Sequence, residues 1–282
     1  MTFKVPVPSN HRESLLENKF IVKKEDHVAW IIFDRPNKLN AMRSEGWREF
    51  GRILGEVSTD RSLRCLIIAG EGKAFQAGHD IGQMLEHIED MKTGDYTVAD
   101  LHEGQKALQE TTRLIRKARF PVIAAVHGFA VGGGCEVTLA CDLVVAGEST
   151  RMGFPEAKVG ATITNGGTWL LPRKVGLGKA RELAFMGEII DAQEALKIGL
   201  VNRVVPDDQL RAEAEQMAAK ICAMSPMSVQ LHKTMLDRGQ EASLETMLNF
   251  ETECLVVASI MKDHIEGVHA FHERREPTFK GY

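Results

Sequence analysis

Two spacings of apolar residues alternate along most of the chain. Continuous apolar runs, which are typical of strands buried on both faces of a sheet, occupy residues 28–33, 63–69, 121–126 and 141–146. Between the first two runs, residues 44–56 place apolar side chains on one helical face, namely Trp47, Phe50, Ile53 and Leu54. A longer charged stretch, 83–119, also predicts helix, with a break near residues 93–95. Strands that alternate with helices in this way indicate an α/β fold built from ββα or βαβ units.

The spacing becomes almost entirely helical after residues 200–205. Pro206-Asp207-Asp208 is a helix start signal, and the apolar side chains that follow it share one face: Leu210, Ala214, Met217, Ala218 and Ile221. We therefore divide the chain into a loose polar leader (1–19), a core domain (20–205) and a helical C-terminal region (206–282). We expect this last region, which has few strands to cover, to pack on the core domain or on other subunits.

Composition narrows the class of protein. The chain has 282 residues, of which 44% are hydrophobic and 26% are charged, as in globular proteins with a sizeable core. Its net charge of −4 shows no bias towards nucleic acid, and no apolar run approaches the roughly 20 residues that span a bilayer. The five cysteines are odd in number and form no CxxC pair, so we expect neither a disulfide framework nor a zinc site. Because a signal-peptide pattern is also missing, we expect a cytoplasmic protein.

Three short segments contain candidate chemistry, and the first directly follows the second apolar run. It reads Lys73-Ala74-Phe75-Gln76-Ala77-Gly78-His79-Asp80-Ile81. A turn that contains glycine lets a ligand approach the backbone, and free N–H groups there can bind an oxygen that develops negative charge. When the segment is taken alone, an ordinary strand-to-helix turn with Asp80 as the N-cap is the better explanation of these residues.

The second segment, Gly132-Gly133-Gly134-Cys135-Glu136, opens a predicted helix. Its three glycines place bare N–H groups at the positive end of the helix dipole. A phosphate-binding loop is the competing interpretation, but no Lys-Ser/Thr follows the glycines and the GxGxxG pattern is absent. A carboxylate here would repel phosphate, whereas it suits a neutral ligand oxygen. Glu136 could also be a first-turn carboxylate that merely stabilises the helix.

The third segment, Gly153-Phe154-Pro155-Glu156, brings a second carboxylate close to further glycines. A surface turn with an exposed glutamate explains this segment when it is taken alone. Together, the three segments supply two backbone donor sites and two carboxylates. Such a set suits a reaction that passes through an enolate-like anion, because N–H groups can hold the oxygen while carboxylates move protons.

In this order and spacing the residues resemble the crotonase superfamily, the enoyl-CoA hydratase/isomerase family, from about Val28 to the C-terminus. The similar motifs are Arg35-Pro36 with Asn40-Ala41, Phe75 with Ala77-Gly78-His79-Asp80, Gly132-Gly133-Gly134-Cys135-Glu136, Phe154-Pro155-Glu156 with Gly160, Ser225-Pro226, and Arg274-Arg275-Glu276-Pro277 with Phe279. The resemblance implies an α/β fold, a crotonase-type spiral of ββα units with a helical C-terminal trimerisation region. The implied assembly is a homotrimer or a dimer of trimers.

The resemblance also implies a role for each matching residue. The backbone N–H groups of His79 and Gly133 would form an oxyanion hole for the thioester oxygen of an acyl-CoA. Glu136 and Glu156, which are 20 positions apart, match the glutamate pair of the hydratases in identity and spacing. The implied contacts with coenzyme A are Lys73, Ala77, Gly78, His79, Asp80, Ile81 and Arg274. The last of these could act on a neighbouring subunit.

The implied reaction is enoyl-CoA hydration, the syn addition of water across the α,β-double bond of an acyl-CoA thioester. No metal or cofactor is implied, because coenzyme A is part of the substrate, and neither nucleic acid nor a membrane is an expected partner. One loop departs from the family pattern: hydratases often have Pro-Gly-x-Gly-Gly-Thr where this chain has Ile163-Thr164-Asn165-Gly166-Gly167-Thr168. Thr164 could contact the water or the acyl group.

The altered loop leaves other acyl-CoA reactions of the family open, namely double-bond isomerisation, thioester or ring-cleaving hydrolysis, and lyase chemistry. A non-catalytic acyl-CoA-binding protein is disfavoured, because both glutamates are present. We interpret His127, Cys135 and Cys141 as packed residues rather than catalysts. A basic cluster is interpreted as a solvated helix face rather than an RNA-binding site; it consists of Arg113, Arg116, Lys117 and Arg119.

Overall fold

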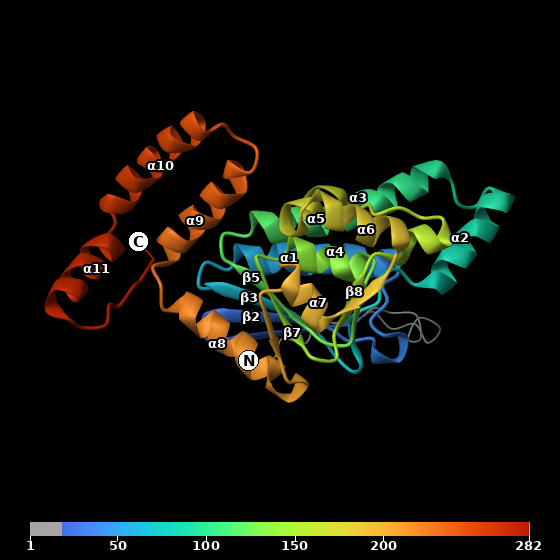
Figure 1. Ribbon diagram of the computed structural model, residues 1–282, viewed down its shortest axis with the longest axis horizontal. Helices are drawn as coiled ribbons and strands as arrows, with labels where there is room; N and C mark the ends of the chain where they lie inside the picture. The colour runs from blue at the N-terminus through green and yellow to red at the C-terminus, as the bar shows by residue number, and fades with distance from the viewer. Residues whose placement is uncertain (1–18, 282) are drawn as a thin grey trace.

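The computed structural model of the protein, which describes residues 19–281, is built on a six-stranded sheet (Figure 1). The strand order is β1-β2-β3-β5-β7-β10, and all neighbours except β1 and β2 run parallel. The strands are β1 Phe20–Glu25, β2 Val28–Phe33, β3 Cys65–Gly70, β5 Val122–Val126, β7 Leu143–Gly147 and β10 Arg203–Val205. The four predicted apolar runs correspond to β2, β3, β5 and β7, so these predictions are confirmed. The edge strand β1 was not predicted, because its half-exposed sequence FIVKKE contains no continuous apolar run.

A second sheet has the strand order β4-β6-β8-β9 and consists of three-residue strands. They are β4 Ala74–Gln76, β6 Phe129–Val131, β8 Arg151–Gly153 and β9 Ile189–Asp191. The strands β4, β6 and β8 each follow a strand of the large sheet, and helices come next, so the chain repeats a ββα unit. The spiral of ββα units that the resemblance implied is therefore confirmed. The sequence did not predict these strands, because three residues are too few for a periodic signal.

Helices cover both faces of the six-stranded sheet. The main core lies on one face, under α1 (Ser44–Thr59), α3 (Val98–Lys117), α4 (Gly133–Ala140) and α5 (Gly167–Val175). The helix α8 (Leu210–Cys222) covers the other face and packs its apolar side chains against Trp30 and Ile32 of β2. Ile31 and Phe33, the alternate residues of β2, belong to the main core. Burial on both faces explains why the strands read as continuous apolar runs.

The charged stretch before β5 forms two helices. The first, α2 (Ile81–Thr93), ends at Gly94, whose φ of 87° is left-handed. The second, α3, begins with a capping box between Thr97 and Asp100. The predicted break near residues 93–95 is thus confirmed. The remaining elements before residue 226 are the 3-10 turns η1 Pro36–Lys38, η2 Pro155–Val159 and η3 Asp207–Gln209 and the helices α6 Leu177–Met186 and α7 Ala192–Lys197.

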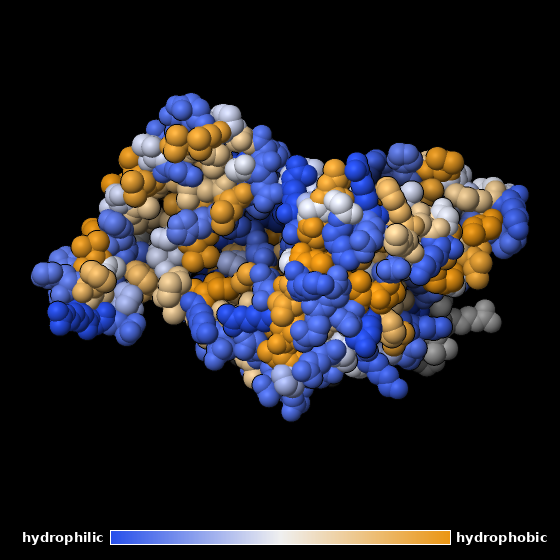
Figure 2. All heavy atoms as spheres, viewed as in Figure 1, coloured by the Kyte–Doolittle hydropathy of each residue, from blue (hydrophilic) through white to orange (hydrophobic). Residues whose placement is uncertain are grey.

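The last three helices extend away from the sheet as a C-terminal lobe (Figure 1). They are α9 Pro226–Gly239, α10 Leu244–Ser259 and α11 Lys262–Glu273. Apolar side chains reach the surface of this lobe (Figure 2), and Phe271 is 88% exposed. The expected leader lies, apart from Lys19, outside the described residues, and the domain limits stay predictions. Among the helices of residues 19–281, none combines the length and apolarity needed to cross a bilayer.

Candidate active site

One cavity of about 780 Å³ collects most of the predicted site residues. Its walls come from the turn after β4, the start of α4, the turn η2, the loop before α5, and the helices α2 and α3. The predicted residues that line the cavity are Ala77, Gly78, His79, Asp80, Ile81, Gly133, Glu136, Glu156 and Thr164. The ββα spiral thus brings the three candidate segments of the sequence to one place.

Two backbone N–H groups meet where the turn after β4 passes the start of α4. A Cβ atom added to Gly78, whose φ is 89°, would stand 3.5 Å from the nitrogen of Gly133. The N–H of Asp80 donates to the carbonyl of Met42 at 2.9 Å, but those of His79 and Gly133 have no acceptor within residues 19–281. Free donors on two segments that pass this closely can hold one oxygen between them, and the oxyanion hole of His79 and Gly133 stays a prediction.

Close packing explains the glycines at the start of α4. Gly132 has φ 55° and ψ −125°, and a Cβ atom there would stand 3.3 Å from Oε1 of Glu156. A Cβ atom on Gly133 would meet the ring of Trp47 at 3.0 Å, and one on Gly134 would overlap the carbonyl oxygen of Gln76. Larger residues at these positions would displace the cavity walls.

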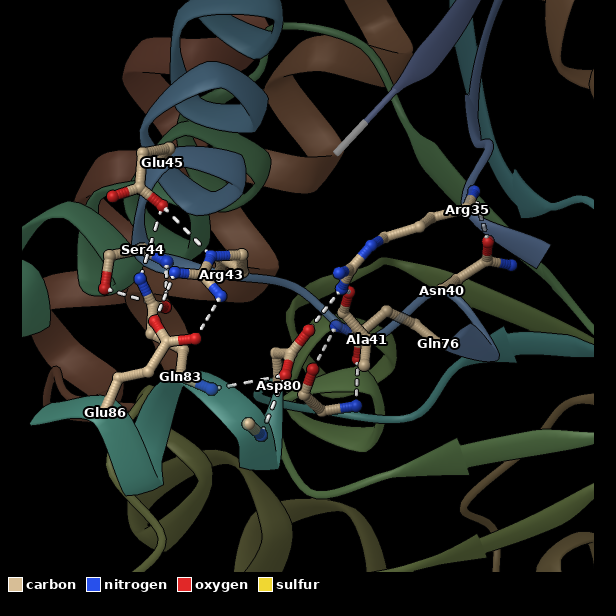
Figure 3. Close-up of polar contacts among 12 residues, drawn as sticks. Arg35, Asn40, Ala41, Arg43, Ser44, Glu45, Gln76, Asp80, Gln83 and Glu86 are labelled. Carbon is tan, nitrogen blue, oxygen red and sulfur yellow. Dashed lines mark hydrogen bonds and ion pairs between the residues drawn. The ribbon is translucent and has the colours of Figure 1, made fainter. Parts of the chain in front are cut away.

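A buried hydrogen-bond network fixes the turn after β4 (Figure 3). Arg35 Nη1 donates to Asp80 Oδ2 at 2.6 Å, and the two side chains are only 7% and 11% exposed. Asp80 Oδ1 accepts from the N–H of Gly82 at 2.8 Å and caps α2. The interpretation of Asp80 as an N-cap is therefore confirmed. Because its carboxylate is occupied by protein groups, a contact of Asp80 with coenzyme A would involve other atoms of the residue.

The same network extends from the turn to the helices behind it. The side chain of Gln76 makes two hydrogen bonds with the backbone of Gly78. Its Nε2 donates to the carbonyl oxygen of Gly78 at 2.9 Å, and its Oε1 accepts from the N–H of Gly78 at 2.7 Å. Asn40 Nδ2 donates to the carbonyl of Ala74 at 2.7 Å. Gln83 Oε1 accepts from the N–H of Ser44 at 2.7 Å and joins α2 to α1. These contacts give the early Arg-Pro and Asn-Ala motif a structural role, which is to hold the turn that carries His79.

Glu136 is 2% exposed and lies in the first turn of α4. Its Oε1 accepts from the N–H groups of Thr164 at 2.9 Å and Asn165 at 2.6 Å. Burial raises the pKa of Glu136 to about 7, with a smaller contribution from the charge of Glu156, although the two N–H groups oppose the rise. A carboxyl group with this pKa can accept and release a proton at neutral pH.

The altered loop supports Glu136 through its backbone. Because N–H groups of residues 164 and 165 make the contacts, the support does not depend on these side chains. Asn165 is fully buried, and its Oδ1 accepts from Thr112 Oγ1 at 2.8 Å, which anchors the loop to α3. Thr164 lines the cavity, and its contact with the water or the acyl group stays a prediction.

Glu156 lies in the turn η2 and is partly buried. Burial raises its pKa, and a hydrogen bond from its own backbone N–H offsets only part of the rise. Its Oε2 is buried and has no hydrogen-bond partner among the described residues. A carboxyl oxygen without donors favours the protonated form. The two glutamates therefore differ in their donors: two loop N–H groups reach Oε1 of Glu136, whereas Glu156 has a hydrogen bond only from its own backbone N–H and its Oε2 has none among the described residues.

Two predicted coenzyme A contacts lie outside the cavity. Lys73 is exposed in the turn before β4. Arg274 follows α11 in a left-handed conformation (φ 55°), and Figure 1 shows α11 at the opposite end of the molecule from α2. A contact between Arg274 and coenzyme A would therefore involve the cavity of another subunit.

The other residues with candidate chemistry have structural contacts. Cys135 and Cys141 are buried, as predicted. His127 is partly buried, and its Nε2 lies 3.0 Å from the carbonyl oxygen of Gly72. Within the basic cluster, Arg113 pairs with Glu110 at 3.2 Å and Arg116 with Asp237 at 2.9 Å.

The family resemblance implies that residues 83–104 supply much of the acyl pocket, and His87, Tyr96 and His102 of this segment line the cavity. Trp47, which was assigned to the core, and Gln105 of α3 also line the cavity and were not predicted. The hairpin sequence is charged and irregular, and which of its faces meets a cavity depends on how it packs. A pattern along the chain does not contain that information.

Comparisons with known proteins agree with this geometry. The family model described as enoyl-CoA hydratase/isomerase matches residues 23–282. The chain is 39% identical over 262 residues to the short-chain-enoyl-CoA hydratase of Clostridium acetobutylicum, covering 92% of this chain and 96% of the relative. It is 35% identical over 264 residues to the 2,3-dehydroadipyl-CoA hydratase of Escherichia coli, covering 94% and 99%. The solved enoyl-CoA hydratase from Bacillus anthracis superposes with a TM-score of 0.86 at 33% identity, covering 93% and 99%. The chain belongs to the enoyl-CoA hydratase/isomerase family of the crotonase superfamily.

Proposed function

We propose that this protein is an enoyl-CoA hydratase that adds water in the syn sense across the α,β-double bond of an acyl-CoA thioester. One observation carries the proposal: a single cavity combines two carboxyl groups of raised pKa with two free backbone donors. The names of relatives support the reaction class, since one is a short-chain-enoyl-CoA hydratase and another, 35% identical and from Syntrophomonas wolfei, a crotonyl-CoA hydratase.

The thioester oxygen would accept hydrogen bonds from the N–H groups of His79 and Gly133. When water attacks the β-carbon, the electrons of the double bond move towards this oxygen and form an enolate. Donors that are already in place stabilise the enolate more than the neutral substrate, and a donor of this kind typically contributes about 10²–10³ in rate. The close packing around Gly78 and Gly133 keeps both donors in place without a substrate.

The two glutamates would share the proton transfers. Glu136, whose charged form is supported by the N–H groups of Thr164 and Asn165, takes a proton from the attacking water. Glu156, whose pKa burial also raises, gives a proton to the α-carbon of the enolate. The product then carries the hydroxyl group on the β-carbon and a new hydrogen on the α-carbon. The proton on Glu136 must return to Glu156 before the next turnover.

Coenzyme A enters as part of the substrate, and the mechanism uses no resident cofactor or metal. Its nucleotide would lie along Lys73 and residues 77–81, with Arg274 of a neighbouring subunit near a phosphate. The five cysteines are free thiols, which is typical of a reducing compartment and supports a cytoplasmic location.

The exposed apolar residues of the C-terminal lobe support a homotrimer or a dimer of trimers. Ile260 is 79% exposed and Phe271 is 88% exposed, and surfaces of this kind are usually covered by another protein chain. Sedimentation of the wild type should give a trimer or hexamer, and Phe271→Glu should shift it to smaller species. A monomeric wild type would contradict this assembly.

The reaction class can be tested with trans-2-enoyl-CoA thioesters of increasing chain length. Hydration removes the ultraviolet absorbance of the conjugated double bond, and hydrolysis instead releases a thiol that a colorimetric reagent detects. We expect loss of the double bond without thiol release. Thiol release would identify a hydrolase, and a shifted double bond would identify an isomerase.

A further inference from the structure

Gln76, the last residue of β4, is fully buried and belongs to the hydrogen-bond network drawn in Figure 3. Both polar atoms of its side-chain amide bind the backbone of Gly78, because Nε2 donates to the carbonyl oxygen and Oε1 accepts from the N–H. An acceptor opposite one atom and a donor opposite the other fix which way the amide is turned. Among the described residues, Gln76 is not one that lines the cavity, so an effect of this side chain on the reaction must pass through the backbone that it holds.

The peptide group that follows Gly78 connects this contact to the candidate site. The carbonyl oxygen of Gly78 and the N–H of His79 belong to one trans peptide, which is planar, so the two bonds point in opposite directions. The oxygen accepts two hydrogen bonds, from Gln76 Nε2 and from the N–H of Met42, each at 2.9 Å. Because the two donors use both lone pairs of the oxygen, they fix the plane of the peptide and therefore the direction of the His79 N–H.

The same residue also contacts the segment that carries the second predicted donor. A Cβ atom added to Gly134 would overlap both the backbone carbonyl oxygen and the side-chain Oε1 of Gln76, so Gln76 packs directly against the backbone of the first turn of α4. The neighbouring residue Gly133 supplies the second N–H group of the predicted oxyanion hole. Gln76 therefore contacts both segments of this hole and contributes to the spacing between their donors.

Hydrogen bonds that are linked in a chain also polarise one another, so a donor at the carbonyl oxygen of Gly78 makes the N–H of His79 a stronger donor. We propose that Gln76 is a positioning residue of the hydration reaction, whose amide orients and polarises the Gly78–His79 peptide so that its N–H holds the thioester oxygen. The inference rests on the proposed hydratase function and on the predicted oxyanion hole. The hydrogen bond to the thioester oxygen strengthens as the enolate forms, so loss of the positioning should lower kcat and leave KM almost unchanged.

Two variants and one control measure the effect on the rate. Gln76→Met keeps the length of the side chain and removes its polar atoms, and Gln76→Asn keeps an amide that is one methylene group too short to reach the same atoms. Either variant should lower kcat for a trans-2-enoyl-CoA about tenfold and change KM less than about twofold, since Met42 still holds the peptide and the loss stays below the roughly 10²–10³ of a missing donor. Thr150→Val removes a buried hydrogen bond to the carbonyl oxygen of Val126, outside the cavity wall, and should leave kcat unchanged.

The infrared spectrum of a bound thioester separates positioning from a loss of stability. Hexanoyl-CoA has no double bond to hydrate, and an isotope label at its thioester carbonyl isolates the stretching band, which moves to lower wavenumber as hydrogen bonds to the oxygen strengthen. We expect the band at higher wavenumber in the Gln76 variants than in the wild type and in Thr150→Val, whereas partial unfolding would only weaken the band. A folded Gln76 variant with the wild-type band position, or with the wild-type kcat, would overturn this inference and leave the hydratase function standing. Absence of hydration of every trans-2-enoyl-CoA by the wild type would overturn both this inference and the proposed function.

Discussion

The ion pair of Arg35 and Asp80 is expected to stabilise the fold and the site together. The substitution Arg35→Leu removes the guanidinium group and leaves the carboxylate of Asp80 buried beside the start of α2, with a side chain that is 11% exposed. The turn that this pair fixes also carries the N–H group of His79. A weaker anchor should therefore lower both the free energy of unfolding and the rate of hydration.

The magnitude follows from the burial of the pair. Removal of one partner of a buried ion pair costs about 3–5 kcal/mol. Asp80 keeps its hydrogen bonds from the N–H groups of Gly82 and Gln83, so we expect a loss of about 3 kcal/mol. Burial alone would raise the pKa of Asp80, but the hydrogen bonds from Arg35 and Gln83 outweigh it and lower the pKa. The stabilisation is therefore complete above the unfolded pKa of about 4 and is lost as the pH falls through the lower, folded pKa.

A double-mutant cycle isolates the pair. Urea unfolding of Arg35→Leu, Asp80→Asn and the double variant would be measured at about pH 7 and at one protein concentration, since assembly also affects stability. Asparagine still caps α2, so the cycle reports the ion pair. We expect a coupling energy of about 2 kcal/mol and a lower kcat in both single variants. Additive effects within about 0.5 kcal/mol, or single variants with wild-type kcat, would refute the reasoning.

Three further predictions concern the glutamates and the glycine beside them. Gly132→Ala should destabilise the protein by about 1–3 kcal/mol and slow hydration at least about tenfold, because the residue has φ 55° and the new methyl group would stand 3.3 Å from Oε1 of Glu156. Thermal melting measures the stability and a kinetic assay the rate, and wild-type values of the two would contradict this prediction. Glu136→Gln should raise the free energy of unfolding by up to about 3 kcal/mol more at about pH 8 than at about pH 5, because a carboxyl with a folded pKa of about 7 and an unfolded pKa of about 4.3 destabilises the fold as it ionises. Urea unfolding at both pH values measures this difference, and an equal gain in stability at the two pH values would contradict the raised pKa. The wild-type kcat/KM should fall about tenfold per pH unit below about pH 7, since the base must be ionised, and a flat profile there would exclude Glu136 as the base.

The sequence predicts the parts of this protein that repeat a pattern or form a local motif. Strands β2, β3, β5 and β7 were found because burial on both faces leaves uninterrupted apolar runs. The glutamates were found because glycines accompany each of them along the chain. Pairing the two glutamates with the donors of His79 and Gly133, however, required the resemblance to a known family.

Features that depend on distant contacts were not predicted. The partners Arg35 and Asp80 are 45 residues apart, and neither segment contains a signal for the other. The contribution of Gln105 to the cavity wall depends on which face of α3 meets the cavity. The support of Glu136 by the loop at Thr164 is made by backbone N–H groups, which every residue except proline provides.

The central claim, that Glu136 and Glu156 act together on one water, is tested most directly by the hydration rate of glutamine variants. Each of Glu136→Gln and Glu156→Gln should slow hydration of a trans-2-enoyl-CoA by about 10²–10⁴. The double variant should be little slower than the worse single variant, because groups that act as a unit are not additive. Glu148→Gln, an exposed glutamate outside the cavity, should keep the wild-type rate. Wild-type hydration by either single variant of the pair would contradict the mechanism.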